Sequence, residues 1–186
     1  TFGPLDLYDY YFEHKRQQAE DIKNSKPIIL EIAREFKEIS AREYGLFESY
    51  HLDDAETAIV VLSSAAGTAK AVVDELRDKG RKVGLLKPRV FRPFPYIEIA
   101  RALSHLKAIA ILDRSVSFGG FGGPLFTEIR SAMVEFGKIP ENFNIIFGLG
   151  GRDINEQDIT GIYNQLDEVV KSGKVKDRIQ YLGVRE

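Results

Sequence analysis

The pattern of hydrophobic and polar positions changes near residue 46. Before that point, apolar and aromatic side chains recur at the three- and four-residue spacing of one helical face. A break at Asn24-Ser25 and Pro27, which suits the first turn of a helix, predicts two separate helices there. After it, short aliphatic runs alternate with helical stripes. We therefore place a helical connector at residues 1–45 and an α/β domain at residues 46–186.

The second region reads as alternating strands and helices. An edge strand is predicted at 46–52 and a short terminal strand at 179–182. Between these, aliphatic runs that indicate strands buried on both faces lie at residues 57–62, 82–86, 108–112 and 144–147. Strands that alternate with helices of this length predict right-handed crossovers and a mostly parallel sheet covered on both faces.

Helix ends in this region carry recognisable signals. Pro124 is placed to open the helix at 125–136, and Asn155 with Asp158 predicts a capping arrangement for the last helix. Gly173 is predicted to end that helix, because glycine readily adopts the left-handed conformation of a helix terminus.

The helical region at 1–45 leaves two interpretations open. Its helices can pack on their own domain, or they can form a docking arm that reaches another domain or subunit. The aromatic run Tyr8–Phe12 favours an interface, because aromatic residues are enriched in the cores of protein–protein contacts.

Ligands of an open parallel sheet meet the carboxyl ends of its strands. The first loop there contains Ser63, Ser64, Gly67 and Thr68 at the start of a predicted helix, where a phosphate or carboxylate would fit. The alternative is that small residues let the helix and strand pack closely. No Walker sequence or dinucleotide fingerprint is present.

The loop from Asp113 to Gly123 also precedes a predicted helix, and it is rich in hydroxyl groups and glycine. It can hold an anion or let two backbones approach closely. Its candidate anion-binding residues are Ser115, Ser117, Gly119 and Gly120. Asp113 and Arg114 point to opposite faces of an extended chain, so each is expected to order a different neighbouring loop.

The remaining strand-end loops carry arginine and aromatic residues on stiff or glycine-rich backbone. Arginine binds carboxylates bidentately and stacks on aromatic rings, and such surfaces are typical of protein interfaces. The predicted interface residues are Arg89, Phe91, Arg92, Phe94, Arg114, Arg152 and Asp153.

Composition excludes several classes of function. A net charge of −2 gives no electrostatic case for nucleic acid or an acidic membrane. The absence of cysteine excludes disulfides and cysteine-ligated zinc or iron–sulfur sites in these residues. The three histidines lack ligand spacing, and no standard catalytic constellation is present, so neither a metal site nor a catalytic residue is predicted. No apolar run reaches the roughly 20 residues that span a bilayer, and we expect a cytoplasmic protein.

Several short motifs occur in one order along the chain. They are Tyr11–Gln18 (YFEHKRQQ), Gly67–Lys70 (GTAK), Arg89–Pro95 (RVFRPFP), the loop Asp113–Gly123 and Gly148–Asp153 (GLGGRD). Together they resemble the C-terminal part of the alpha chain of 2-oxoacid:ferredoxin oxidoreductases, most closely the pyruvate enzymes.

That resemblance implies a transketolase C-terminal-type domain, a three-layer α/β/α sandwich around five strands with the first strand antiparallel. It also implies an enzyme that makes acyl-CoA and CO2 from a 2-oxoacid on thiamine diphosphate and Mg²⁺, and passes electrons through iron–sulfur clusters to ferredoxin. The family's cofactor-binding signatures lie in other domains or chains, so these residues are expected to bind no cofactor and to be inactive alone.

The preferred interpretation is a structural and assembly domain of such an enzyme, with the loop Asp113–Gly123 facing a partner. Two alternatives stay open. One is an independent phosphate- or nucleotide-binding α/β module, and the other is an interaction domain of an unrelated complex.

Overall fold

The computed structural model describes residue 5 and residues 7–185, which fall into two units. The first unit is Thr1–Leu46 with Val90–Phe94, and the second is Phe47–Arg89 with Pro95–Glu186. The first unit contains a helix, and the second contains the sheet.

The first unit is built on one helix, α1, which runs from Tyr11 to Ser40. The predicted break at Asn24-Ser25 is therefore wrong. Pro27 lies inside the helix, where it removes one backbone hydrogen bond, and the good helix-forming residues on both sides carry the helix through. The Ser25 hydroxyl donates to the carbonyl of Ile22, 2.6 Å away, instead of capping a new helix.

None of the 30 residues of α1, all of which the structure describes, is buried. Tyr11, Phe12, Ile32 and Ile39 are among its exposed large apolar side chains. A helix in a protein gains most of its stability from packing its apolar face. Both interpretations of the helical region stay predictions.

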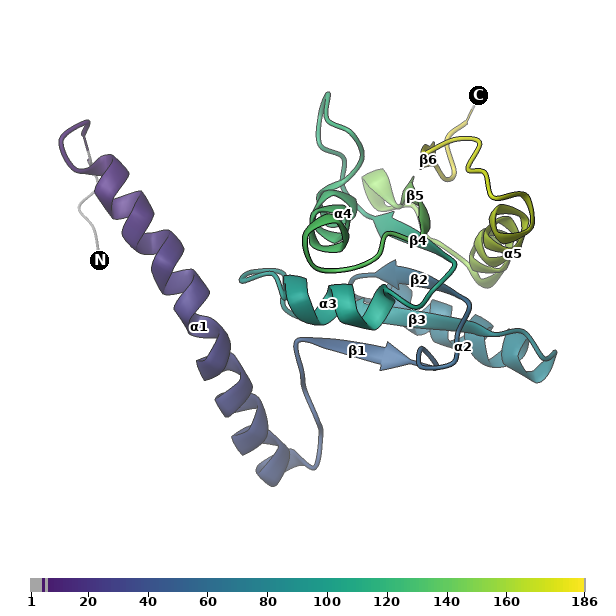
Figure 1. Cartoon of the computed structure of the whole chain (residues 1–186), viewed down its shortest axis with the longest axis horizontal. Helices are drawn as coiled ribbons and strands as arrows, with labels where there is room; N and C mark the ends of the chain where they lie inside the picture. The colour runs from purple at the N-terminus through teal and green to yellow at the C-terminus, as the bar shows by residue number, and fades with distance from the viewer. Residues whose placement is uncertain (1–4, 6, 186) are drawn as a thin grey trace. The chain divides into compact units, whose positions relative to one another are not determined.

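The second unit contains a six-stranded sheet (Figure 1). Its strands are β1 (Phe47–Tyr50), β2 (Thr57–Val61), β3 (Val83–Pro88), β4 (Ala108–Asp113), β5 (Glu141–Ile146) and β6 (Ile179–Tyr181). They lie in the order β1-β3-β2-β4-β5-β6. As predicted, β1 pairs antiparallel with β3 and the other pairs are parallel. The sheet has six strands rather than five, because the short terminal strand pairs with β5.

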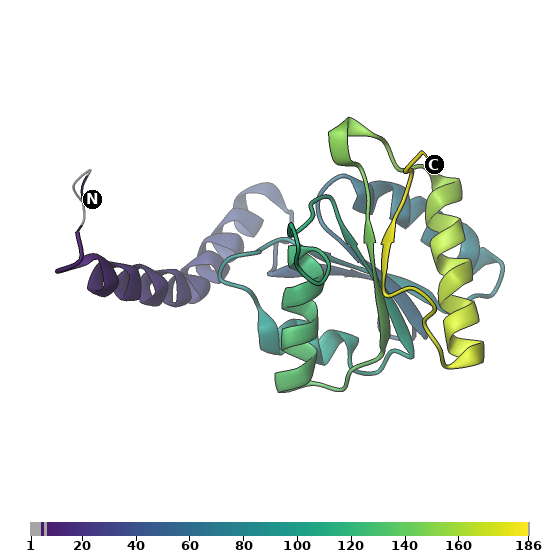
Figure 2. The same cartoon turned by 90° about the horizontal axis from the view of Figure 1, so that it is seen from above.

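Helices cover both faces of this sheet, as predicted. Helices α2 (Ala65–Asp78) and α5 (Glu156–Ser172) pack together on one face, and α3 (Tyr96–Leu103) and α4 (Pro124–Phe136) pack together on the other. Figure 2 shows the sheet nearly edge-on between α4 and α5. The strands β2 and β4 are buried along their whole length, as expected of strands between two helical layers.

A hydrophobic core lies between the sheet and the α2–α5 layer. Tyr163 of α5 is fully buried there, and its hydroxyl donates to the carbonyl of Gly84 in β3, 2.9 Å away. The capping arrangement predicted for α5 is confirmed: the side chains of Asn155 and Asp158 each accept a 3.0 Å hydrogen bond from the other residue's backbone N–H. Gly173 ends the helix with φ of 64°.

The edge strand β1 is tied to its neighbours by Glu48. Its carboxylate pairs with Lys70 of α2 and, at 2.7 Å, with Arg89 just after β3. The Lys70 hydrogen bond, helped by Arg89, holds the pKa of Glu48 below its usual value although partial burial acts in the opposite direction. A carboxylate with a lowered pKa stabilises the fold above its unfolded pKa, and this contribution is lost as the pH falls through the folded pKa.

Replacing Glu48 with glutamine is therefore expected to lower the free energy of unfolding by about 1 kcal/mol at pH 7. The difference between Glu48→Gln and the unchanged chain should disappear near pH 2. Glu48 is protonated at that pH, so residue 48 is uncharged in both proteins. Urea unfolding followed by circular dichroism at the two pH values measures this. Glu168→Gln on the exposed side of α5 is the control, and an equal effect of both changes would contradict the assignment.

Candidate interaction site at the carboxyl ends of the strands

Asp113, the last residue of β4, lies at the centre of the carboxyl-terminal end of the sheet. Its side chain is almost fully buried, and its two carboxylate oxygens accept the backbone N–H groups of Leu125 and Phe126 at 2.8 and 3.1 Å. These N–H groups belong to the first turn of α4, where they have no partner within the helix. Asp113 therefore caps α4 from the neighbouring strand, which confirms the prediction that it orders a nearby loop.

Asn144 of β5 completes this cap. Its side-chain amide donates to Asp113 Oδ2 at 2.9 Å and to the carbonyl of Ile111 at 2.8 Å, and its Oδ1 accepts the N–H of Gly123 at 2.8 Å. Sequence reasoning missed this residue. The available signal was a polar amide within an otherwise apolar buried strand, since a buried polar group requires hydrogen-bond partners.

The environment of Asp113 acts on its pKa in two directions. Burial raises the pKa of the carboxyl group, whereas the hydrogen bonds from Leu125, Phe126 and Asn144 oppose that shift by stabilising the charged form. Burial is the larger effect, so the pKa lies above its usual value. Its carboxylate is enclosed by the α4 terminus and Asn144, which gives it a structural role.

Two glycines make this cap possible. A Cβ atom on Gly123 would lie 2.2 Å from Asp113 Cγ. One on Gly122 would lie 2.6 Å from the ring of Phe126, and Gly122 also has φ of +86°. At these two positions the loop backbone lies against side chains of the same chain. The predicted close approach of two backbones stays a prediction.

The anion-binding interpretation of this loop loses its best donors. An anion at the start of α4 would need the N–H groups that Asp113 already occupies. Ser115, Ser117, Gly119 and Gly120 are exposed, and the N–H of Gly120 donates to the carbonyl of Ser117. The described residues at the α4 terminus therefore do not fit the diphosphate of thiamine diphosphate. Anion binding by these residues stays a prediction.

The start of α2 is arranged differently. Ser63 has φ of 62°, which is uncommon for a residue other than glycine, and it is exposed together with Ser64. The N–H groups of Ala66 and Gly67 donate to the carbonyls of Ser63 and Ser64. A Cβ atom on Gly67 would meet open space, so close packing within the chain does not explain this glycine. Thr68 beside it is half-buried.

Arg114 connects two of the loops. Its Nε atom donates to the carbonyl of Gly148 at 3.3 Å, and Gly148 has φ of 69°. This confirms the prediction that Arg114 orders a neighbouring loop. Farther along, Arg152 donates to the carbonyl of Gly183, and Asp153 is exposed beside it. Their roles in an interface stay predictions.

The residues predicted for an interface in the loop between β3 and α3 have different environments. Phe94 is only 5% exposed, so it is a packing residue and not a surface residue as predicted. Arg89 forms the ion pair with Glu48 described above. Arg92 is exposed, and its guanidinium lies over the ring of Phe91 at 4.3 Å from the ring centre. Arg92 and Phe91 keep the surface position that an interface requires.

Two phenylalanines of the loop Asp113–Gly123 were missed by sequence reasoning. The side chain of Phe118 is fully exposed, and that of Phe121 is 64% exposed. Arg130 of α4 lies over the ring of Phe121, 5.5 Å from its centre, and among the described residues no cation lies over the ring of Phe118. The signal was that neither phenylalanine belongs to a helical or strand stripe. Exposed aromatic side chains on a loop are typical anchors of protein–protein contacts.

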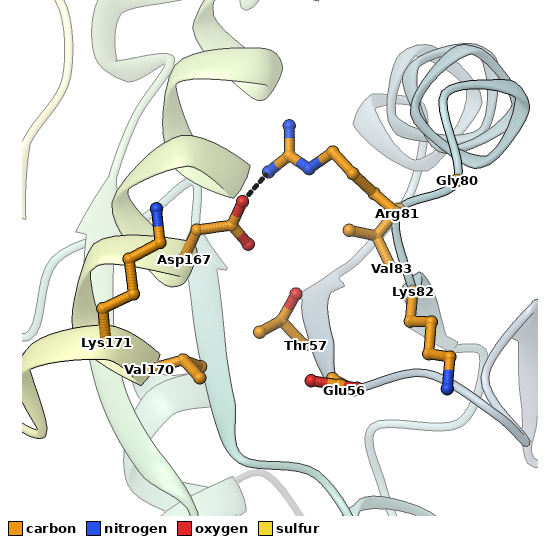
Figure 3. Close-up of a pocket in the computed structure, with 9 residues that line it drawn as sticks. All are labelled: Glu56, Thr57, Gly80, Arg81, Lys82, Val83, Asp167, Val170 and Lys171. Carbon is orange, nitrogen blue, oxygen red and sulfur yellow. Dashed lines mark ion pairs between the residues drawn. The ribbon is translucent and has the colours of Figure 1, made fainter.

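A pocket at the opposite, amino-terminal edge of the sheet has a different character (Figure 3). Arg81 crosses it to the carboxylate of Asp167 on α5 at 2.8 Å and to Asn164 at 3.0 Å. The remaining lining residues are Glu56, Thr57, Gly80, Lys82, Val83, Val170 and Lys171. Charges of both signs line the pocket. The ion pair between Arg81 and Asp167 joins the segment just before β3 to α5. We assign it a structural role.

Within the described part of the chain, no group of three or more His, Cys, Asp or Glu side chains could hold a metal ion. A search of the same residues finds no helix long and apolar enough to cross a membrane. The chain contains no cysteine for an iron–sulfur cluster.

The fold and the loops at the carboxyl ends of the strands together define a three-layer α/β/α domain with an exposed aromatic loop. Comparison with known families identifies it further. The chain belongs to the family described as pyruvate:ferredoxin oxidoreductase core domain II, whose sequence profile matches residues 55–159.

Curated relatives extend the match beyond that region. The pyruvate synthase subunit PorA of Thermotoga maritima is 45% identical over all 186 residues, which cover 46% of that protein. The corresponding subunit of Methanothermobacter thermautotrophicus is 39% identical over the same length and share. The ketoisovalerate oxidoreductase subunit VorA of Pyrococcus abyssi is 37% identical over 96% of this chain and 44% of its own. The chain thus spans about half the length of these relatives.

A solved structure has a similar fold. It is the 2-oxoglutarate:ferredoxin oxidoreductase from Magnetococcus marinus, with 2-oxoglutarate, coenzyme A and succinyl-CoA bound. The match has a TM-score of 0.51 and 22% identity, and covers 68% of this chain and 20% of that one. At this identity the likeness supports the fold alone.

Proposed function

We propose that this chain is a structural and assembly domain of a thiamine-diphosphate-dependent 2-oxoacid:ferredoxin oxidoreductase, with pyruvate as the expected 2-oxoacid. The enzyme would form acyl-CoA and CO2 and pass electrons to ferredoxin in the cytoplasm. Membership of the core domain II family and likeness to PorA and VorA subunits support this proposal.

The observation that carries the assembly role is Phe118. It lies on a loop whose base is fixed by Asp113 and Asn144, while its own ring is fully exposed. A rigid base limits the entropy that the loop loses on binding, and an aromatic ring supplies apolar area for a partner's pocket. Thiamine diphosphate, Mg²⁺ and the iron–sulfur clusters would be held by other domains or subunits, because the residues described above do not fit them.

Phe118→Ala is expected to weaken association with the other subunits by about 2 kcal/mol, or roughly thirtyfold in Kd. The fold should be unchanged, because the ring makes no buried contact. Titration of the purified chain with its partner subunits, followed by mass photometry, measures the effect. Phe118→Leu is the matched variant and should keep most of the affinity, since it retains an apolar side chain.

The competing proposal, an independent nucleotide-binding module, makes a different prediction. Calorimetry should then show tight binding of a nucleotide or coenzyme A to the isolated chain. Such binding, together with no association with iron–sulfur subunits, would overturn the assembly role. The occupied N–H groups at the start of α4 count against the module.

A further inference from the structure

A pocket with a volume of about 470 Å³ lies at the carboxyl ends of β5 and β6. Its walls are the turn that follows β5 and the segment that follows β6, which meet at one end of the sheet (Figure 2). Arg152 and Arg185 line it, and none of its described lining residues is an aspartate or a glutamate. This pocket, which we call the β5–β6 pocket, is therefore a positively charged site on a chain whose net charge is −2.

The two arginines have hydrogen-bond donors that the domain itself does not use. Arg152 donates to the carbonyl of Gly183 through Nη1 alone. The exposed guanidinium of Arg185 has no hydrogen-bond or ion-pair partner among the described residues. Each guanidinium group therefore keeps a pair of N–H donors in the fork geometry that fits a carboxylate.

The turn after β5 supplies a second set of donors. Gly148 (φ 69°, ψ 9°) and Gly150 (φ 71°, ψ 16°) are left-handed, and Leu149 between them is helical. This alternation turns successive N–H groups toward one concave point, which is an anion-binding arrangement. The N–H groups of these three residues donate to no acceptor within the described part of the chain, and all three residues line the pocket. At the start of α4 the donors are occupied by Asp113, so the two sites differ.

The rim of the pocket indicates which kind of anion it receives. Leu149, Tyr181 and Val184 line it and are 43%, 53% and 63% exposed. Arginine beside aromatic and aliphatic side chains is typical of protein–protein contacts. Lysine, a common phosphate-binding residue, is absent from its described lining. The composition therefore favours a carboxylate carried by a protein segment over a phosphate compound.

The pocket also adjoins the loop that carries Phe118. Arg114, at the base of that loop, donates to the carbonyl of Gly148 at 3.3 Å. At the other end of the loop, a Cβ atom on Gly122 would lie 3.1 Å from the side chain of Ile179 in β6. A partner that binds Phe118 therefore lies next to the pocket.

We infer that the β5–β6 pocket binds a carboxylate group of an acidic segment on a partner subunit. Arg152 and Arg185 bind this carboxylate together with the N–H groups of Gly148–Gly150, and the apolar rim packs against the rest of the segment. This inference rests on the proposed function and deepens it, because it gives the chemistry of the partner. The partner then carries an apolar site for Phe118 and an acidic segment beside it.

Arg185→Glu is the test variant, because its replacement breaks no contact within the described part of the chain. It is expected to weaken association with the partner subunits about tenfold in Kd at about 50 mM salt. At about 1 M salt, where charges more than about 3 Å apart are largely screened, the difference from the unchanged chain should fall below about twofold. Surface plasmon resonance at the two salt concentrations measures Kd.

The matched control is Arg101→Glu, which makes the same charge change at an exposed arginine in the last turn of α3. It should change Kd by less than about twofold at either salt concentration. Thermal unfolding of both variants followed by circular dichroism shows whether the fold is retained, and both Tm values should stay within about 1 °C of the unchanged chain.

The preference for a carboxylate can be tested on the chain alone, with acetate as the probe. Acetate is expected to shift the amide NMR signals of Gly148, Leu149 and Gly150, whereas sodium chloride at equal ionic strength is not. Arg185→Glu should reduce these shifts, because it replaces a donor of the pocket with a negative charge. Inorganic phosphate is titrated in parallel.

Several results would overturn the inference. Equal Kd values for Arg185→Glu and Arg101→Glu would show that the pocket is outside the contact, and a loss that persists at about 1 M salt would exclude a charge interaction. Absence of the acetate shifts would contradict binding by the N–H groups. Phosphate shifts at a concentration about tenfold below that of acetate would assign the pocket to a phosphate compound.

The two proposals fail in different ways. Weaker association of Phe118→Ala together with unchanged association of Arg185→Glu contradicts this inference and leaves the assembly role intact. Unchanged association of Phe118→Ala contradicts the proposed function itself.

Discussion

Gly123→Ala is expected to lower the free energy of unfolding of the sheet unit by about 2–4 kcal/mol. The backbone of Gly123 is extended, with φ of −83°, so alanine is permitted by its torsion angles. The cost is steric and local: the new methyl group would lie 2.2 Å from Asp113 Cγ and 2.5 Å from Oδ2. Asp113 must then move away from the N–H groups of α4, which become unsatisfied in a buried place.

The matched control is Gly67→Ala at the start of α2. A Cβ atom there meets nothing within 4 Å, and alanine favours the helix, so this change should stabilise the chain by about 0.4–1 kcal/mol. Chemical unfolding of both variants gives the comparison. If Gly123→Ala proved as stable as the unchanged chain, the Asp113 cap would not be important for the fold.

Phe126→Ala is expected to be the most destabilising change, at about 3–5 kcal/mol. The Phe126 side chain is fully buried at the first turn of α4, beside Gly122 and Phe121. Its removal leaves a cavity next to the cap formed by Asp113, where the surrounding backbone is held by hydrogen bonds and cannot collapse freely. Thermal unfolding followed by circular dichroism measures the loss.

The control for this change is Phe118→Ala on the same loop. It removes the same side chain from a fully exposed position, so the free energy of unfolding should change by less than about 0.5 kcal/mol. The two phenylalanines therefore separate stability from assembly: Phe126 is expected to matter for the first and Phe118 for the second. Similar destabilisation by both would mean that Phe118 packs against the domain.

The fold could be predicted from the sequence because its signals are local and agree with one another. Aliphatic runs identified β2 and β4, and Asn155 with Asp158 identified the start of α5, since each depends on neighbours within a few residues. The pairing of Arg114 and Asp113 with different loops followed from the alternation of side chains along a strand.

The failures concern interactions between residues distant in sequence, or weak signals outweighed by their surroundings. Pro27 indicated a helix start, but its cost of a few kcal/mol did not end a helix of this length. Asn144 lies 31 residues beyond Asp113, so no local pattern connects the two. The burial of Phe94 and the exposure of Phe118 depend on how the loops fold back, which composition does not determine.

The two edge strands limit the ways in which this sheet can meet another protein. At one edge β1 has four residues, and at the other β6 has three. Edges this short offer few unpaired backbone groups for strand addition. Edge-to-edge joining of two sheets is therefore disfavoured, and aggregation through these edges is suppressed. Recognition by this domain therefore has to use side chains on loops and helices. Specificity among partners can then change through single surface residues, with the hydrogen-bonded framework of the sheet left intact.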